Sequence, residues 1–399
     1  FLFILNYLLS DIVNGIWYYV IGFIFVWTIL ALYKMYHEDS NLEMGFPIIM
    51  WRTHKFIDFI DKLAKKAPKF WKWYMNVGVV ICFGAMALMT YILIISLGTV
   101  TKTPSVFILI PGVDIPGSPI FIPFLSGFIA LVLLIIVHEF SHGILSRVEN
   151  IDVKSMGLLL FFIIPGAFVE PDEEQVLKAS RISKLRILAA GSMANIVLAV
   201  IALLVFALLA NCVIPAVYDQ EGVEVTQIVN NAPAVGHISK GELLTGINNK
   251  TIKNSTDYVN AVHNLSPNTT VKLKTNKGTS KFKLGENPNN KSIGYMGIRC
   301  QEHFIIKENI KNTYGDVLPW FWLSLEDLFK WIYIINLSVG LFNLLPMKPL
   351  DGGKMFEELL SYKLSEDNTY LITLFTSVFI AMVIIASLII GILIGFKII

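Results

Sequence analysis

Long apolar runs recur along the whole chain and are separated by shorter polar segments. The runs that are long enough to cross a bilayer lie at 12–33, 77–99, 119–145, 184–214, 318–346 and 369–396. Because a membrane-spanning helix needs roughly 20 mainly apolar residues, this pattern predicts a multi-span α-helical membrane protein with about six transmembrane helices.

Two shorter segments indicate contact with the membrane surface. Residues 155–169 are apolar but too short for a comfortable span, so we expect a re-entrant segment or a hairpin at the membrane face. Residues 61–74 mix lysines with phenylalanine, tryptophan and tyrosine. Such a mixture is typical of a helix that lies on the membrane surface.

The composition agrees with a membrane protein. Of the 399 residues, 55% are hydrophobic and 16% are charged, whereas soluble domains carry about 25% charged residues. The formal net charge of +2 gives no reason to expect a nucleic-acid partner. The first partner that we expect is therefore the lipid bilayer.

Lysine and arginine are distributed unevenly between the polar segments. Eight of them lie in 34–76 and six in 146–186, but 100–118 contains only one. Cytoplasmic loops of membrane proteins are enriched in these residues. We therefore expect the first two segments in the cytoplasm, and the long loop 215–317 outside together with both termini.

Residues 215–300 differ in character from the rest of the chain. Short alternating runs such as TVKLKT predict strands, and residues 255–265 predict a short helix with a serine or threonine cap. The order of these elements resembles a PDZ domain, a small α/β fold that binds an extended peptide at a sheet edge. The resemblance implies that main-chain N–H groups near Gly222 and Val223 bind a peptide C-terminus. A structural exported domain without a ligand is the alternative.

Two further features of this region allow more than one interpretation. Sequons of the type Asn-x-Ser/Thr lie at Asn249, Asn254, Asn264, Asn268 and Asn290. They indicate either an exported, glycosylated surface or a chance result of Asn-rich loops. Cys212 and Cys300 flank the region, and a disulfide between them is one option.

The apolar run at 129–145 contains the residues that indicate chemistry. His138, Glu139 and His142 interrupt a segment that is otherwise apolar. Ionisable groups inside a membrane are costly and are therefore functional by default. On a helix the two histidines share one face, one turn apart, so both can bind one Zn2+ while Glu139 acts on a water molecule. Satisfied structural histidines are the alternative.

A third ligand must come from another part of the chain, because a catalytic zinc site usually has three protein ligands and one open position. The candidate is Asp351, which follows a span end broken by Pro346 and Pro349. Irregular backbone at membrane depth is tolerated inside protein or along a wet cavity. Both spans run in the same direction and bring their polar groups toward the cytoplasmic side. An ordinary turn aspartate before Gly352 is the alternative.

These motifs together resemble the site-2 protease family of intramembrane metalloproteases. The resemblance rests on HEFSH, on NLLPMKPLDG from Asn343 to Gly352, and on GSMAN from Gly191 to Asn195. It covers about residues 119–356, with a PDZ-like insert before the aspartate-bearing span. Members cleave transmembrane or membrane-anchored proteins within or near the bilayer, as in regulated intramembrane proteolysis.

The resemblance implies a role for each motif residue. The implied site consists of His138, His142 and Asp351 as zinc ligands, Glu139 as general base, and Asn343 and Asn195 as polar helpers that orient substrate or oxyanion. By packing alone, the small residues of GSMAN suit close helix contact. Residues 166–174 would form a membrane-dipping loop that pairs with an unwound substrate, and its acidic residues would otherwise be a solvated face.

These expectations divide the chain into five parts. They are 1–118 with the N-terminal spans and a cytoplasmic loop, 119–214 with the membrane catalytic core, 215–300 with the extracytoplasmic PDZ-like domain, 301–356 with a linker and the aspartate-bearing span, and 357–399 with the last span. We expect a zinc-dependent endopeptidase of the cell membrane, acting on transmembrane protein substrates from a site toward the cytoplasm. The alternatives are an ion transporter, which needs polar residues along a continuous path, and an inactive scaffold, which lacks a ligand or the base.

Overall fold

The computed structural model describes residues 16–37, 41–100, 106–113, 115, 118, 120–162, 164–229, 232–287, 291–315 and 317–395. The chain divides into two compact units. The membrane unit comprises Phe1–Phe206 and Asp327–Ile399, and the inserted unit comprises Ala207–Glu326. The start of the predicted span 12–33, the last residue of the span 369–396 and the sequon at Asn290 lie outside the described residues.

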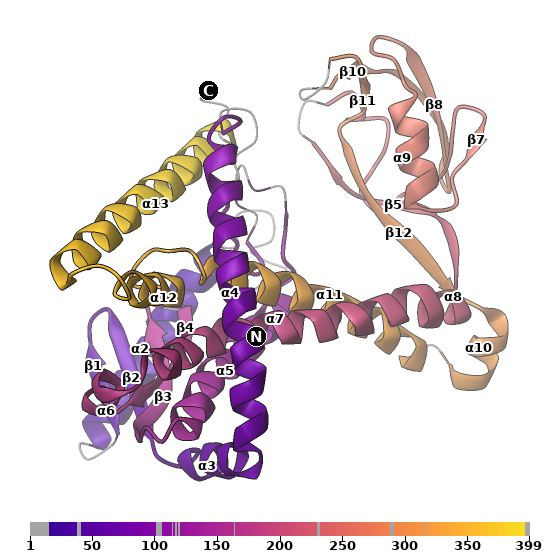
Figure 1. Ribbon diagram of the computed structural model, residues 1–399. Coiled ribbons are helices and arrows are strands. Elements are labelled where there is room, and N and C mark those ends of the chain that lie inside the picture. Colours follow the sequence, from indigo (N-terminus) through magenta and orange to yellow (C-terminus); the bar gives the residue numbers. More distant parts are fainter. Residues whose placement is uncertain are drawn as a thin grey trace. The chain divides into compact units, whose positions relative to one another are not determined.

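Five helices among the described residues are long and apolar enough to cross a membrane (Figure 1). These spans are α2 (Ile16–Tyr36), α4 (Pro68–Ser96), α5 (Phe124–Val148), α7 (Arg181–Leu208) with its continuation through η1 (Leu209–Val213) and α8 (Ile214–Val217), and α13 (Glu366–Gly395). The 25 residues of α5 rise roughly 38 Å at about 1.5 Å per residue. That length exceeds the roughly 30 Å of a bilayer's hydrocarbon core.

The sixth predicted span is not confirmed. Helix α11 (Val317–Phe342) covers the predicted segment but carries Glu326, Asp327 and Lys330 near its middle. Asp327 accepts a hydrogen bond from the Ser126 hydroxyl at 2.7 Å and forms an ion pair with Lys330 at 2.8 Å. Charges within a membrane protein are usually paired in this way. The apolar residues on either side of these charges made the segment resemble one continuous span.

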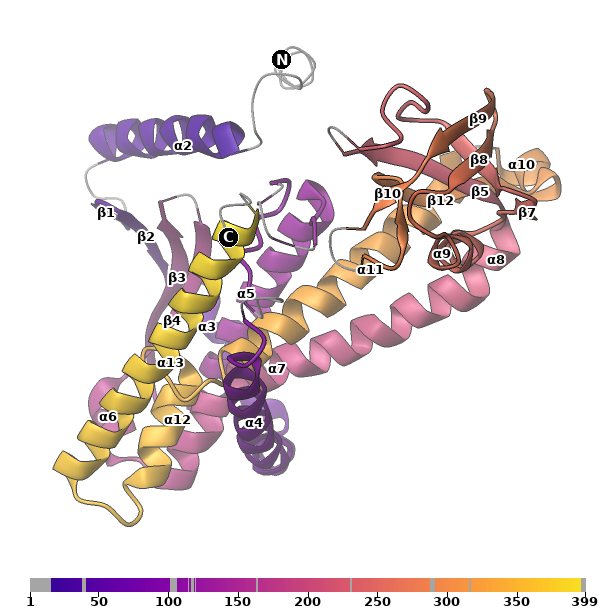
Figure 2. The same ribbon diagram turned by 90° about the horizontal axis from the view of Figure 1, so that it is seen from above.

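A four-stranded antiparallel sheet belongs to the membrane unit. Its strands, in spatial order, are β1 (Leu42–Gly45), β2 (Ile48–Thr53), β3 (Val153–Phe161) and β4 (Ile164–Pro171) (Figure 2). The pairing of β3 with β4 confirms a hairpin for 155–169, and its place at the membrane face stays a prediction. Strands β1 and β2 were not predicted, because both are short and β2 joins the sheet through β3, about a hundred positions further along the chain. Strand β4 is an edge strand, and it packs against α5.

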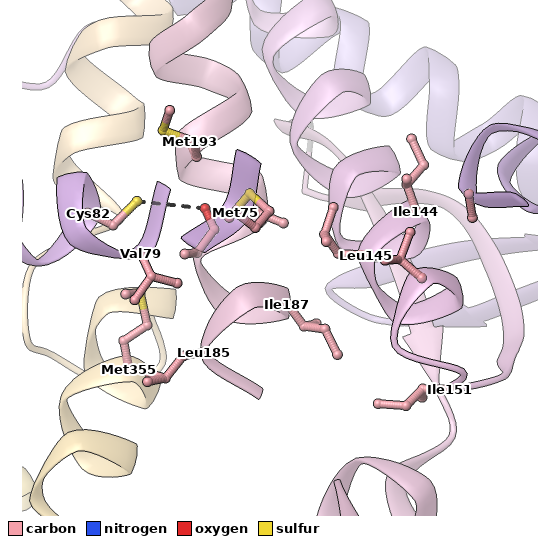
Figure 3. Close-up of a cluster of buried hydrophobic side chains, with 14 of the residues drawn as sticks. Met75, Val79, Cys82, Ile144, Leu145, Ile151, Leu185, Ile187, Met193 and Met355 are labelled. Carbon is pink, nitrogen blue, oxygen red and sulfur yellow. Dashed lines mark hydrogen bonds between the residues drawn. The ribbon is translucent and has the colours of Figure 1, made fainter. Parts of the chain in front are cut away.

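The core of the membrane unit holds α4 together with the helices that carry the motif residues. Figure 3 shows a cluster of buried side chains from these helices, including Met75 and Cys82 of α4, Leu145 of α5 and Met355 of α12 (Asp351–Leu360). The Cys82 thiol donates to the carbonyl of Ala189 in α7 at 3.8 Å. Close packing fixes the helices relative to one another, because voids between them would lose dispersion contacts.

Two short helices complete this part of the membrane unit. Helix α3 (Ile57–Lys66) packs against α5 through Ile60, which is fully buried. Helix α6 (Glu173–Lys178) begins after Asp172, whose carboxylate accepts the N–H of Gln175 at 3.0 Å. This hydrogen bond satisfies one of the free N–H groups at the start of the helix.

The inserted unit contains a six-stranded antiparallel sheet, against which the helix α9 (Ser255–His263) packs. The strand path is β12 (Ile298–Ile306), β5 (Tyr218–Ile228), β6 (Leu243–Ile247), β8 (Thr270–Thr275) and β9 (Gly278–Lys283), with β7 (Lys250–Thr251) on β6. Alternate residues of β8 are buried, which confirms the strand predicted from TVKLKT. The short strands β10 (Gly285–Glu286) and β11 (Gly294–Tyr295) pair separately, and α10 (Glu308–Tyr314) follows β12. The cap of α9 is Asn254, rather than the predicted serine or threonine.

The predicted carboxylate-binding loop at Gly222 and Val223 is wrong in position. Both residues lie inside β5, which pairs with β12 on one side and β6 on the other. The Gly222 N–H donates to the carbonyl of Lys253 at 2.9 Å, and the Val223 side chain is fully buried. Gly222 is needed for a different reason. Its φ is +87°, and a Cβ there would lie 2.5 Å from the carbonyl oxygen of Leu244.

The three cysteines are free thiols, so the optional Cys212–Cys300 disulfide is not formed. Cys212 is exposed, whereas Cys300 lies partly buried in β12. Burial raises the pKa of the Cys300 thiol to about 11. Since the thiolate is the reactive form of cysteine, this shift disfavours reactions of Cys300 near neutral pH.

Candidate metal centre

The two histidines of HEFSH project from the last turns of α5, one turn apart. Their Nε2 atoms lie 3.2 Å from each other. His138 is 7% exposed, and His142 is partly buried. The i, i+4 spacing on one helix therefore brings the two nitrogens to one point, as the sequence predicted.

The carboxylate of Asp351, from a distant part of the sequence, lies at the same point. Its Oδ2 lies 3.1 Å from Nε2 of His138 and 3.2 Å from Nε2 of His142. Asp351 is the first residue of α12, and the segment 343–350 between α11 and α12 is not helical. The carboxylate thus stands at a helix start, where backbone N–H groups favour negative charge.

The two glycines after Asp351 allow α12 to begin so close to the preceding segment. A Cβ on Gly352 would lie 2.2 Å from the carbonyl oxygen of Leu344, and one on Gly353 would lie 2.4 Å from the carbonyl carbon of Met347. The Gly352 N–H donates to the Asn343 carbonyl at 2.8 Å. Side chains at either glycine would move Asp351 away from the histidines.

The three donor atoms fit a divalent metal ion. Ligands at about 2.0–2.1 Å from a tetrahedral zinc lie about 3.3–3.4 Å apart, close to the 3.1–3.2 Å between these atoms. Among the described residues, Oδ2 of Asp351 is buried and has no hydrogen-bond donor. A buried carboxylate oxygen without a donor is costly unless a cation compensates it. The donor set His, His and carboxylate is one that zinc enzymes use.

Gly191 of α7 leaves the space that this arrangement needs. A Cβ at this position would lie 2.5 Å from Nε2 of His142 and 2.6 Å from Nε2 of His138. For the small residues of GSMAN, sequence reasoning predicted only close helix contact. The first glycine of this motif in fact lies directly against both imidazoles.

The other nitrogen of each imidazole also has a partner. Nδ1 of His142 lies 2.7 Å from the carbonyl oxygen of Ile187, and Nδ1 of His138 lies 3.1 Å from Nδ2 of Asn195. Because a carbonyl can only accept, Nδ1 of His142 carries the proton and its Nε2 is free for a metal. Asn195 is fully buried, and its Oδ1 has no partner among the described residues.

Glu139 lies beside the three donor atoms but does not belong to them. Its Oε2 accepts a hydrogen bond from the N–H of Val169 at 3.1 Å. Val169 belongs to the edge strand β4, so the sheet positions this carboxylate. The Asn343 amide nitrogen lies 3.3 Å from Nε2 of His138, on the side of Asp351.

A cleft of about 760 Å³ opens onto these groups. It is lined by β4, by the start of α12 and by the side chains of His138, Glu139, His142, Asn343 and Asp351. Glu170 in its wall is not a free acidic group, since it accepts hydrogen bonds from Ser155 at 2.6 Å and Arg52 at 2.5 Å. The Ser155 hydroxyl, together with the charge of Arg52, holds the pKa of the Glu170 carboxyl below its usual value.

The structure brings most of the predicted site residues together. The group within the membrane unit consists of His138, Glu139, His142, Asn195, Asn343 and Asp351. Gly222 and Val223 belong to the inserted unit instead. Sequence reasoning missed the Ile187 carbonyl and the Val169 N–H, because backbone partners leave no mark in the sequence.

Comparison with known proteins identifies the family. The sequence profile described as "Peptidase family M50" matches residues 126–384. The chain therefore belongs to peptidase family M50, the site-2 protease family of membrane metalloproteases. This result confirms the resemblance inferred from the three motifs. Metalloproteases of this family use zinc.

Several individual proteins are similar to the chain. An uncharacterized protein of Methanocaldococcus jannaschii is 29% identical over 340 residues, covering 82% of this chain and 81% of that protein. The PDZ domain of an SdrC-like protein from Listeria monocytogenes matches at 24% identity and a TM-score of 0.19, over 20% of this chain and 87% of that chain. The PDZ domain of a Listeria innocua SdrC-like protein matches at 29% identity and a TM-score of 0.19, over 21% and 96%.

Proposed function

We propose that this chain is a zinc-dependent endopeptidase that cleaves transmembrane or membrane-anchored proteins within the bilayer. The observation that carries the proposal is the meeting of His138, His142 and Asp351 at one point, with Glu139 beside them at the edge of a cleft. A transporter needs ligands but has no use for a carboxylate held next to them. An inactive scaffold would lack one of these groups.

His138, His142 and Asp351 are the residues that would hold the metal. When bound there, zinc would supply Lewis-acid chemistry that polarises a scissile carbonyl and activates water. Glu139 would take the proton from the attacking water and pass it to the leaving amine nitrogen. Its hydrogen bond from the Val169 N–H leaves the second carboxylate oxygen available for this transfer.

Asn343 is placed to assist the carbonyl of the substrate. With Nε2 of His138 occupied by a metal, the Asn343 amide has no acceptor on that imidazole and can donate to an oxygen in the cleft instead. A donor aimed at the developing oxyanion stabilises the transition state. This assignment keeps the predicted role of Asn343 as a polar helper.

The edge strand β4 offers a place for the unwound substrate. Peptide bonds in a transmembrane helix are hidden in i to i−4 hydrogen bonds, so the helix must open before cleavage. Strand β4 lines the cleft from Phe168 to Pro171, and no strand among the described residues pairs with its outer edge. An extended substrate segment can pair there, next to Glu139.

We propose the cell membrane as the location, with the centre toward the cytoplasmic side and the inserted unit outside. The uneven distribution of lysine and arginine supports this orientation. Binding of a peptide C-terminus by the inserted unit remains a prediction. Strand β12 is at the edge of its sheet, and α9 packs near it. This edge is a better candidate for peptide binding than β5, which is paired on both sides.

For Asn195 we propose a role that differs from the predicted one, which was to orient substrate or oxyanion. A metal on Nε2 of His138 leaves the proton on Nδ1, and that N–H needs an acceptor. If the side-chain amide of Asn195 is flipped, Oδ1 takes the place of Nδ2 and can accept the hydrogen bond from Nδ1 of His138. The same flip gives Oδ1, which otherwise has no partner, the Nδ1–H of His138 as its donor. We therefore propose that Asn195 orients His138 for metal binding, as the Ile187 carbonyl orients His142.

Replacing Asn195 by leucine should weaken zinc binding, while replacing it by aspartate should not. Loss of a partner of this kind typically costs roughly 10–100-fold in metal affinity. Aspartate keeps an acceptor at the same place, so it serves as the matched control. Zinc affinity is measured by competition with a chelating dye on the purified proteins. Equal affinity for the leucine variant and the unchanged protein would show that Asn195 does not orient His138.

The proposed activity is tested by metal removal. The purified chain, reconstituted with a membrane-spanning substrate, should lose cleavage on treatment with a zinc chelator and recover it when zinc is added back. Magnesium is the control ion, because it prefers oxygen ligands in octahedral geometry. Cleavage that persists in the metal-free protein would exclude a metalloprotease mechanism.

A further inference from the structure

A basic and aromatic surface lies where α3 meets α4. It consists of Lys62 and Lys66 of α3 and Lys69, Phe70 and Trp73 of α4, and we call it the basic collar. All five side chains are exposed, with Phe70 at 52% and Trp73 at 63%. Exposed aromatic rings beside lysines are unusual on a surface that faces only water.

The collar lysines differ from the other lysines of the same segment. Lys65 forms an ion pair with Asp61 at 3.6 Å, and Lys72 forms one with Glu149 at 3.4 Å. No carboxylate in the described part of the chain lies within ion-pair distance of a collar lysine. The three ammonium groups are therefore available to an external anion.

The position of the collar along α4 indicates that the external anion is a lipid headgroup. Helix α4 has 29 residues, and its length of roughly 43 Å exceeds the hydrocarbon core by roughly 13 Å. The exposed apolar side chains Val77, Val80 and Ile81 follow Trp73 along the helix. Tryptophan is enriched where hydrocarbon meets the headgroups, and Lys69 precedes Trp73 by one turn.

The orientation of α3 agrees with this placement. The helix ends at Lys66, and α4 begins two residues later at Pro68. Figure 1 shows α3 lying across the end of α4 rather than extending it. If α4 crosses the bilayer, α3 therefore runs along the membrane surface, at the depth of the lipid phosphates.

Helix α3 also contacts the turn that carries HEFSH. A Cβ on Gly143 would lie 2.8 Å from Cδ1 of Ile60, which shows how closely the two helices approach. The rings of Phe56 and Phe59 lie 5.9 and 6.2 Å from the ring of Phe140. A ligand that holds α3 in place would also restrain this turn.

We propose that the basic collar binds anionic phospholipid headgroups and thereby stabilises the HEFSH turn of α5. Ammonium groups pair with the lipid phosphates, and Phe70 and Trp73 enter the interface beside them. This inference depends on α4 being a membrane span and not on the proposed protease activity. The partner is the anionic lipid of the surrounding bilayer.

The test compares lipid binding by the full chain and by a triple variant, Lys62→Gln, Lys66→Gln and Lys69→Gln. Native mass spectrometry of the detergent-purified proteins counts bound phosphatidylglycerol and phosphatidylcholine. The triple variant should lose roughly 10- to 100-fold in affinity for phosphatidylglycerol, since each lysine contributes substantially at a charged surface. Its affinity for phosphatidylcholine should not change.

A matched variant controls for net charge. Lys240→Gln, Lys250→Gln and Lys253→Gln remove the same three charges from exposed positions of the inserted unit, and should leave phosphatidylglycerol binding unchanged. An equal loss in this control would show that total charge, and not the collar, binds the lipid. Displacement of phosphatidylglycerol by an equal concentration of inorganic phosphate would show a phosphate site and would also overturn the proposal.

Hydrogen exchange tests the second half of the proposal without measuring activity. In nanodiscs, the amides of residues 138–143 should exchange several-fold more slowly with phosphatidylglycerol than with phosphatidylcholine alone. The triple collar variant should lose this difference, and the control variant should keep it. Equal exchange of the unchanged protein in both lipids would show that the collar does not act on the HEFSH turn.

Discussion

The Glu139→Gln variant should lose cleavage and keep its metal. Glu139 is not one of the three converging donors, so its replacement leaves His138, His142 and Asp351 in place. Glutamine has nearly the same shape, and its amide oxygen can still accept the Val169 N–H that now binds the carboxylate. It cannot take a proton from water near neutral pH. Because a general base contributes typically 10²–10⁴-fold, cleavage should fall by about that factor.

The measurement pairs cleavage rate with zinc content on the same samples. Glu173→Gln is the matched control, since Glu173 also lines the cleft but makes no contact with the three donors. It should retain both zinc and activity. A Glu139→Gln protein that cleaves at the unchanged rate would show that another group is the base. One that loses zinc would show that Glu139 is a ligand.

The Asp351→Ala variant should lose zinc itself. Removing the carboxylate leaves two imidazoles, and a site with two protein ligands holds zinc far more weakly than a site with three. We expect zinc content after dialysis to fall as far as it does in His142→Ala. Activity should fall with it, because the remaining chemistry depends on the metal.

Two comparisons make this result specific. Asp367→Ala removes an exposed carboxylate at the start of α13 and should leave zinc content unchanged. Metal analysis after size-exclusion chromatography separates loss of zinc from loss of fold. Full zinc occupancy in folded Asp351→Ala would show that a different group completes the site and that Asp351 only supports it.

The metal-binding group could be predicted from the sequence because its signals are local. The i, i+4 spacing of His138 and His142 defines their geometry on any helix. The prolines before Asp351 showed that the backbone there is irregular, and polar groups on irregular backbone within a membrane need a partner. The structure places the three donor atoms together in agreement with both signals.

Other features could not be predicted because they depend on distant contacts. Strands β1 and β2 pair with each other, but they join the larger sheet only because β2 pairs with β3, about a hundred residues further along the chain. Gly191 contacts the imidazoles because α7 packs against α5, and the motif itself shows only that the residue is small. The alternating pattern around Val223 revealed a strand but not that strands flank it on both sides.

The number of membrane spans was predicted less well than the metal-binding group, for a different reason. In α11, Glu326, Asp327 and Lys330 are close enough together that the apolar residues around them dominate a long window. The structure shows why such charges are tolerated, since Asp327 has both Ser126 and Lys330 as partners. Partners on other helices are not visible in a hydropathy pattern.

The central claim is that this chain hydrolyses peptide bonds inside the membrane through these residues. The direct measurement is mass spectrometry of products from membrane-spanning substrates that contain a helix-breaking residue, co-reconstituted with zinc-loaded protein. We expect new termini within the apolar segment for the unchanged protein, and none for Glu139→Gln or Asp351→Ala. The same termini from Glu139→Gln, or zinc transport across the vesicles without any new terminus, would contradict this claim.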